Sequence, residues 1–86
     1  MDVSAVTRRA LSMLAPVADA AGVALGSNLK DKCVVQGTED DLYQICFNLL
    51  ENGIKYNRPG GRVMADVYRD GDQVLLEVSD TGVGIP

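Results

Sequence analysis

The sequence contains no histidine, which removes several kinds of chemistry. The chain cannot use an imidazole for acid–base catalysis, for metal binding or as a phosphate acceptor. Only eight residues are lysine or arginine, and the net charge of −4 argues against nucleic acid as the main partner. The longest apolar runs are a few residues, far short of a spanning helix, and the first residues lack a signal-peptide pattern. We therefore expect no direct contact with a membrane.

What is present is the composition of a small globular domain. Apolar residues make up 47% of the chain and charged residues 23%, which is neither disordered nor membrane-like. A chain of 86 residues forms at most one small domain. The two cysteines, Cys33 and Cys46, lie in apolar surroundings without metal-type spacing. We interpret them as buried thiols of a reduced cytosolic protein rather than as a disulfide.

Residues 48–57, with the sequence NLLENGIKYN, form the most informative segment. At 100° per residue, most of a helix here is apolar and about a third of its circumference is polar. The polar stripe holds Gln44, Asn48, Glu51, Asn52 and Lys55. Asparagine is about 0.5 kcal/mol less favourable than alanine inside a helix, so two asparagines one turn apart indicate a specific contact. The alternative is a solvated stripe on a helix that packs by its other side.

The segment before this helix predicts one long helix and two short strands. Apolar residues at spacings of three and four predict a helix over residues 3–21, with Asp2 or Ser4 as its cap and Gly22 as its stop. Pro16 lies inside this pattern, so we expect a kink or a less regular second half. Short strands are predicted over residues 23–29 and 33–36.

The rest of the chain predicts a second helix and a hairpin. A helix over residues 38–56 begins at Thr38, whose hydroxyl is expected to cap the first amides in an approximate capping box with Asp41. Residues 62–68 and 73–79 alternate as the strands of an antiparallel hairpin. Together these elements predict a two-layer α/β (α+β) sandwich, with two helices against a mixed sheet.

The chain closes with SDTGVGIP, in which Asp80 precedes Gly82 and Gly84. Glycines on both sides of one small residue permit close approach of the backbone to a ligand. By itself, the pattern Asp-x-Gly-x-Gly is equally compatible with a plain turn.

Taken together, NLLENGIKYN, the following PGG, the hairpin and SDTGVGIP resemble the ATP-binding catalytic domain of bacterial sensor histidine kinases. These kinases belong to the superfamily of ATPases that includes DNA gyrase, Hsp90 and MutL. The specific motifs are the N box, residues 48–57, and the first glycine box, residues 80–84. The resemblance implies a Bergerat-type ATP-binding fold and a single partial domain over residues 1–86, truncated after the first glycine box. The family's lid and second glycine box are absent from it.

The resemblance implies a role for each residue of the phosphate end of an ATP site. Asn52 matches the asparagine that binds the magnesium ion, and Asn48 matches a second polar contact near the metal and phosphates. Lys55 matches a basic residue that approaches the phosphates, although an ordinary surface lysine is the simpler alternative. No residue of this segment is expected to be catalytic. Glu51 is expected to face solvent.

For the base end of the site, the resemblance implies four further contacts. Tyr56 matches an aromatic residue near the sugar and base, with a core-anchoring tyrosine as the alternative. Asp80 matches the carboxylate that accepts a hydrogen bond from the adenine amino group. Gly82 and Gly84 match glycines that let the backbone close over the base. Gly53 replaces the family's usual alanine, at a cost of roughly 1 kcal/mol in helix propensity.

The implied activity is transfer of the γ-phosphate of Mg-ATP to a histidine on a separate helical domain, in a cytoplasmic two-component system with a response regulator. The resemblance leaves open whether the parent protein has a membrane anchor in segments outside this sequence. Gyrase-like relatives activate water with a glutamate where this chain has Asn48, so hydrolysis by that route is not expected. Without a lid, the segment is expected to bind ATP weakly or not at all and to lack kinase activity. Because the family's later strands are missing, a sheet edge or face should be uncovered, and the segment is expected to self-associate. The alternatives are an anti-sigma-type serine kinase and an interaction module with a vestigial nucleotide site.

Overall fold

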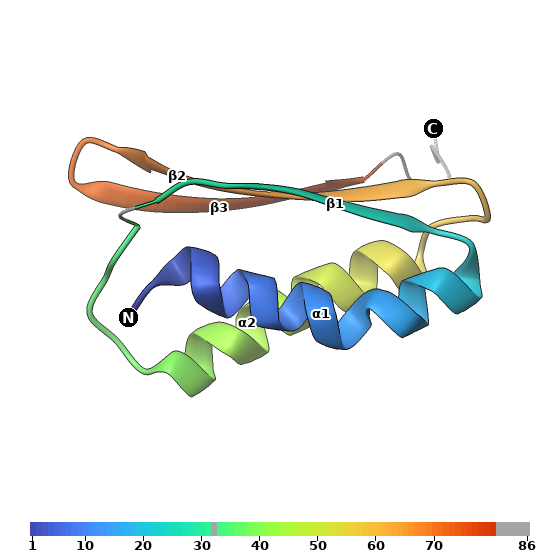
Figure 1. Cartoon of the computed structure of the whole chain (residues 1–86), viewed down its shortest axis with the longest axis horizontal. Helices are drawn as coiled ribbons and strands as arrows, with labels where there is room; N and C mark the ends of the chain where they lie inside the picture. The colour runs from blue at the N-terminus through green and yellow to red at the C-terminus, as the bar shows by residue number, and fades with distance from the viewer. Residues whose placement is uncertain (32, 81–86) are drawn as a thin grey trace.

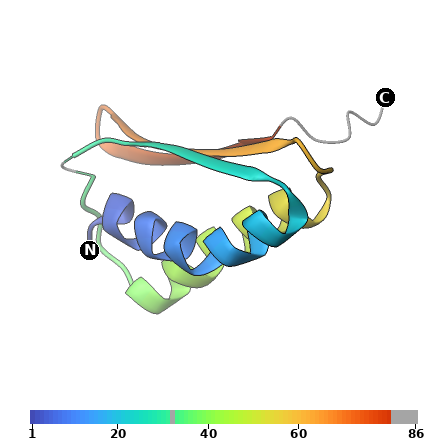
Figure 2. The same ribbon diagram turned by 45° about the vertical axis from the view of Figure 1, so that its right-hand side comes forward.

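The computed structural model describes residues 1–31 and 33–80, which form a two-layer structure (Figure 1). Both helices lie on the same face of one three-stranded sheet, as a view turned by 45° also shows (Figure 2). The elements are α1 (Val3–Ala21), β1 (Ala24–Leu29), α2 (Glu39–Lys55), β2 (Arg62–Asp70) and β3 (Gln73–Asp80). The predicted two-layer α/β fold is confirmed. No helix in the described ranges has the length and apolar character needed to cross a membrane.

The sheet is mixed, with the strand order β1-β2-β3. β1 runs parallel to β2, and β2 pairs with β3 as the predicted antiparallel hairpin. Both hairpin strands are longer than predicted, so that only Gly71 and Asp72 separate them, with Gly71 at φ +60°. Alternate β2 side chains are fully buried against the helices, namely Val63, Ala65 and Val67. On the outer face, the Tyr68 hydroxyl donates to Glu77 over 2.7 Å, and this hydrogen bond raises the pKa of Tyr68.

The strand predicted over residues 33–36 is wrong. The segment makes an isolated antiparallel bridge, between Val34 and Asp2, and joins no strand of the sheet. Its backbone contacts go to the start of the chain: the Val3 amide donates to Cys33 over 2.9 Å, and the Val35 amide donates to Met1 over 2.9 Å. The partner segment turns into α1 directly after this bridge, so a longer ladder has nothing to pair with.

Helix α1 begins and ends where the sequence predicts. The Asp2 carboxylate accepts hydrogen bonds from the amides of Ser4 and Ala5, at 3.0 and 3.4 Å. Gly22 ends the helix at φ +70°, a conformation that glycine adopts without a steric penalty. The α-helix continues through Pro16 to its predicted end. Pro16 lies on the exposed side, where water can hydrogen-bond the carbonyl that proline leaves without a donor.

The cap predicted for the second helix is wrong. Thr38 occupies the N-cap position of α2, but its side chain makes no capping hydrogen bond. The first turn instead contains Glu39, Asp40 and Asp41, and negative charge is favourable at the positive end of a helix dipole. Glu39 also forms an ion pair with Arg9 of α1 at 2.9 Å. Charge therefore takes the place of the side-chain cap at this end.

The two helix starts should differ in their sensitivity to substitution. We expect Asp2→Ala to reduce the free energy of unfolding by about 1 kcal/mol, because two α1 amides lose their acceptor. Thr38→Ala removes no capping hydrogen bond and should cost no more than about 0.5 kcal/mol. Urea unfolding followed by circular dichroism measures both variants. Equal losses would contradict this assignment.

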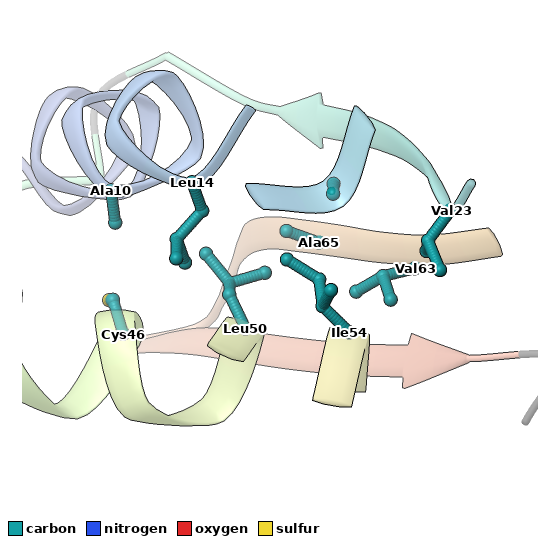
Figure 3. Close-up of a cluster of buried hydrophobic side chains, with 9 residues drawn as sticks. Ala10, Leu14, Val23, Cys46, Leu50, Ile54, Val63 and Ala65 are labelled. Atoms are coloured by element: carbon teal, nitrogen blue, oxygen red, sulfur yellow. The ribbon is translucent and has the colours of Figure 1, made fainter. Parts of the chain in front are cut away.

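The core lies between the sheet and both helices (Figure 3). Leu50 and Ile54 project from α2 toward Leu14 and Val63, and Leu50 is fully buried. Both cysteines are buried and free, as predicted. The Cys46 thiol lies 3.7 Å from the Thr7 hydroxyl, and burial raises its pKa. This thiol therefore stays protonated near neutral pH and acts as a small core side chain.

Candidate functional site

The polar stripe of α2 faces solvent over its whole length. Gln44, Asn48, Glu51, Asn52 and Lys55 are all exposed. Within the described part of the chain, the carboxamides of Asn48 and Asn52 make no hydrogen bond. Both side chains are thus available to a ligand.

Part of α2 that the sequence assigns to the buried surface is also exposed. Ile45 is 55% exposed and Leu49 is 44% exposed. On a helical projection, both lie on the side of Asn52 away from Lys55. The available surface of α2 is therefore wider than the polar stripe and includes apolar side chains beside Asn52.

Asp80 is brought to this helix by the register of the hairpin. It is the last residue of β3 and pairs with Val63, so both side chains belong to the sheet face that the helices cover. A Cβ atom placed on Gly53 would lie 3.9 Å from Oδ2 of Asp80. The carboxylate therefore lies next to the α2 turn that contains Asn52. In Figure 1, the ends of α2 and β3 lie at the same end of the molecule.

Lys55 and Tyr56 lie beside each other at the end of α2. The Lys55 ammonium lies 5.4 Å from the centre of the Tyr56 ring. Lys55 borders a hollow between α2 and the end of α1, beside Val17 and Ala21. Tyr56 is 66% exposed, so it does not anchor the described core. Asn48 borders a separate shallow hollow with Tyr43 and Phe47.

The loop after α2 contains a positioning residue that the sequence analysis missed. The Asn57 carboxamide donates to the Arg62 carbonyl over 3.1 Å and accepts from the Arg58 amide over 2.9 Å. A side chain at Gly61 would overlap this carboxamide. Asn57 therefore joins the end of α2 to the start of β2. An asparagine two residues before a Pro-Gly pair was the available signal.

The donor set fits a magnesium-bearing adenine nucleotide. Mg²⁺ favours oxygen ligands and is commonly held by one or two protein groups together with substrate phosphates. The exposed carboxamides of Asn48 and Asn52 offer neutral oxygens, and Asp80 offers an acceptor on the neighbouring strand. In residues 1–31 and 33–80, no three His, Cys, Asp or Glu side chains group as a metal site. Gly82 and Gly84 lie outside the described residues.

Comparisons with known proteins identify the family. The sequence profile of the histidine kinase-, DNA gyrase B- and HSP90-like ATPases matches residues 37–86. The circadian input-output histidine kinase CikA of Synechococcus elongatus is 51% identical over 45 residues, which cover 52% of this chain and 6% of CikA. This chain thus spans a small part of that relative.

Two solved structures have the same fold over the whole of this chain. The mycobacterial sensor histidine kinase MprB aligns with a TM-score of 0.87 at 28% identity, over 56% of its own chain. The catalytic domain of histidine kinase ThkA aligns with a TM-score of 0.90 at 15% identity, over 60% of its own chain. The profile match covers more than half of the sequence, and the chain therefore belongs to the family of histidine kinase-, DNA gyrase B- and HSP90-like ATPases.

Proposed function

We propose that the chain contributes to the ATP-binding catalytic domain of a cytoplasmic sensor histidine kinase. The observation that carries the proposal is the position of the Asp80 carboxylate beside the α2 turn that contains Asn52. Asn52 and Asp80 are far apart in sequence, and in the fold the last residue of β3 lies at the same end of the molecule as the end of α2 (Figure 1). The match to histidine kinases such as CikA favours this branch of the family.

The exposed groups of α2 would bind the phosphate end of the nucleotide. Asn52 would ligate Mg²⁺ through its carboxamide oxygen, and Asn48 would contact the phosphates one turn away. Lys55 has a flexible, exposed side chain, which can swing from its position near the Tyr56 ring toward anionic oxygens. The metal, when bound, neutralises charge on the phosphates.

The end of β3 would bind the base. The Asp80 carboxylate would accept a hydrogen bond from the adenine amino group, a donor that guanine lacks at that position. Tyr56 offers an exposed ring beside the sugar and base. Gly82 and Gly84 would allow the backbone to approach the base closely.

The chain's own part in phosphoryl transfer would be positioning and electrostatics. The chain has no histidine, so the phosphate acceptor must be a histidine on another domain, from which a response regulator would receive the phosphate. Asn48 is a carboxamide and cannot act as a general base toward water. This arrangement suits a kinase better than an ATP hydrolase.

Nucleotide titrations followed by heteronuclear NMR test the proposal, because they detect millimolar as well as tight binding. Mg-ATP should perturb the resonances of Asn48, Asn52 and Asp80 and leave those of Asn28, on the outer face of the sheet, unchanged. Mg-GTP should bind more weakly. Chelation of Mg²⁺ should reduce the shifts along α2. Equal responses to ATP and GTP, or shifts confined to residues outside α2 and the end of β3, would overturn the proposal.

We also propose that the chain self-associates through β3. In the described sheet, β3 is an edge strand, and its helix-facing side chains Val74, Leu76 and Val78 are only half-buried. Edge strands with apolar side chains favour pairing with another copy. Sedimentation velocity should show dimers that grow with concentration. Leu75→Lys, on this edge, should weaken them, and Val34→Lys, at an exposed site away from β3, should not. A monomer at every concentration would contradict the proposal.

A further inference from the structure

Strand β1 forms the edge of the described sheet that lies opposite β3. The Ala24 amide donates to the Gly61 carbonyl over 2.9 Å, beside β2. Alternate residues of a strand direct their main-chain groups to the same side, so those of Leu25, Ser27 and Leu29 point away from the sheet. The sequence of β1, ALGSNL, has no charged residue and no proline, the features that usually protect an edge strand. This edge is therefore open to pairing with another extended chain.

A hollow of about 660 Å³ lies between this edge and α1. Figure 1 and Figure 2 both show β1 above α1, with the two elements side by side. A strand added to β1 would direct every second side chain toward the helix layer, because alternate residues face one side of a sheet. The hollow could receive such a side chain. Most of its lining is apolar, and it includes Ala15, Pro16, Val23 and Leu25 together with the polar residues Ser12 and Asp19.

The polar groups of the hollow are acceptors. Asp19 is exposed, and its carboxylate makes no hydrogen bond or ion pair within residues 1–31 and 33–80. It lies in the last turn of α1, which has no basic residue, so it meets the negative end of the helix dipole without compensation. Pro16 has no amide proton, so the Ser12 carbonyl, four residues earlier, lacks its helical donor. Among the described residues that line the hollow, none is lysine or arginine. The hollow therefore favours a positively charged donor.

We propose that β1 and the hollow beside it bind an extended segment of a partner protein, with apolar side chains facing α1 and a lysine or arginine near Asp19. Antiparallel pairing is slightly more stable than parallel pairing. It would place the basic residue at the end of the segment, because Asp19 lies near the start of β1. A second copy of the chain fits less well, because it has the same Asp19 and a net charge of −4. The surface lies at the opposite edge of the sheet from Asp80, so this binding does not depend on the nucleotide.

A capped peptide, acetyl-Thr-Val-Thr-Val-Thr-Lys-amide, is the probe, because its valines and its lysine share one side of a strand. Titrated to several millimolar into the ¹⁵N-labelled chain, it should shift the amide resonances of Leu25, Ser27 and Leu29 downfield. Their hydrogen exchange should slow roughly twofold when about half of the sites are occupied. The same peptide with N-methylated amides cannot pair along its main chain and should not bind. A peptide that ends in glutamate should bind roughly threefold more weakly or worse.

Two substitutions separate main-chain pairing from the charge contact. Ser27→Pro removes an amide that points away from β2, at an edge where proline is tolerated, and should weaken peptide binding roughly fivefold. Ser27→Ala keeps that amide and is the matched control. Asp19→Lys should reverse the preference between the lysine and glutamate peptides. It places positive charge at the negative end of the α1 dipole, so the fold should be retained. Thermal unfolding checks that each variant is folded.

The remaining outcomes would overturn the proposal. No response of β1 to several millimolar peptide, shifts confined to β3 or α2, or equal binding of the N-methylated peptide would exclude pairing at this edge. A preference for lysine that Asp19→Lys leaves unchanged would exclude the charge contact, and this test stands even if Ser27→Pro does not fold. Shifts at β1 that grow with protein concentration in the absence of peptide would identify a second copy of the chain as the occupant instead of a partner protein.

Discussion

Leu50→Ala is expected to reduce the free energy of unfolding by about 2–5 kcal/mol, because it removes a fully buried side chain and leaves a cavity. Leu50 projects from α2 into the space between α1 and the sheet, where Leu14 and Ala65 surround it (Figure 3). Small domains have total stabilities of only about 5–15 kcal/mol. The loss should therefore lower the melting temperature by roughly 10 °C or more.

The neighbouring leucine provides the control for this prediction. Leu49 is 44% exposed on the side of α2 that faces away from the core, and Leu49→Ala should cost less than about 1 kcal/mol. Calorimetric or urea unfolding of the two variants compares them directly. Similar losses from both would mean that α2 packs on the sheet in a different rotation about its axis.

Asn52→Ala is expected to weaken Mg-ATP binding by roughly tenfold or more, because a group that contacts a charged ligand contributes about 1.5–3 kcal/mol. The side chain is exposed and makes no hydrogen bond within the described chain, so its removal should leave stability nearly unchanged. Isothermal calorimetry or NMR titration, with and without Mg²⁺, measures the effect. Asn28→Ala, on the outer face of the sheet, is the matched control.

Asp80→Asn should act on base selectivity and leave the metal dependence intact. The substitution replaces a charged acceptor by an amide that also donates, and it should reduce the preference for ATP over GTP by roughly tenfold. If Asn52→Ala changes the Mg²⁺ dependence of binding and Asp80→Asn changes the base selectivity, the two residues act at the phosphate end and the base end of the nucleotide, respectively. Nucleotide binding that neither variant alters would favour an interaction module with a vestigial site.

The largest parts of the fold follow from local sequence patterns. The apolar spacing of α1 and the alternation of β2 and β3 predict these elements because helix and strand periods differ and each element buries one side. The strand expected at residues 33–36 fails for a non-local reason, since its partner is the short segment before α1. The side-chain cap expected at Thr38 does not form, although Thr38 occupies the N-cap position of α2 and the expected acidic first turn follows it.

The candidate site is also only partly predictable from the local sequence. The stripe of Asn48, Asn52 and Lys55 is visible in the sequence, because helical geometry alone places these residues on one side of α2. The exposure of Ile45 and Leu49 is not visible in the sequence, because burial depends on which neighbours pack against a helix. The local sequence shows that a residue is apolar, but it does not show whether another element covers that residue in the fold.

Both helices, the hairpin and the family can be predicted from the sequence, because each depends on residues that are close together along the chain. The position of Asp80 beside α2 depends instead on tertiary packing. The pairing of Asp80 with Val63 and the packing of α2 on the sheet place the end of β3 beside α2. That contact joins residues far apart in sequence through the register of a hairpin and the packing of a helix, and neither has a local signature.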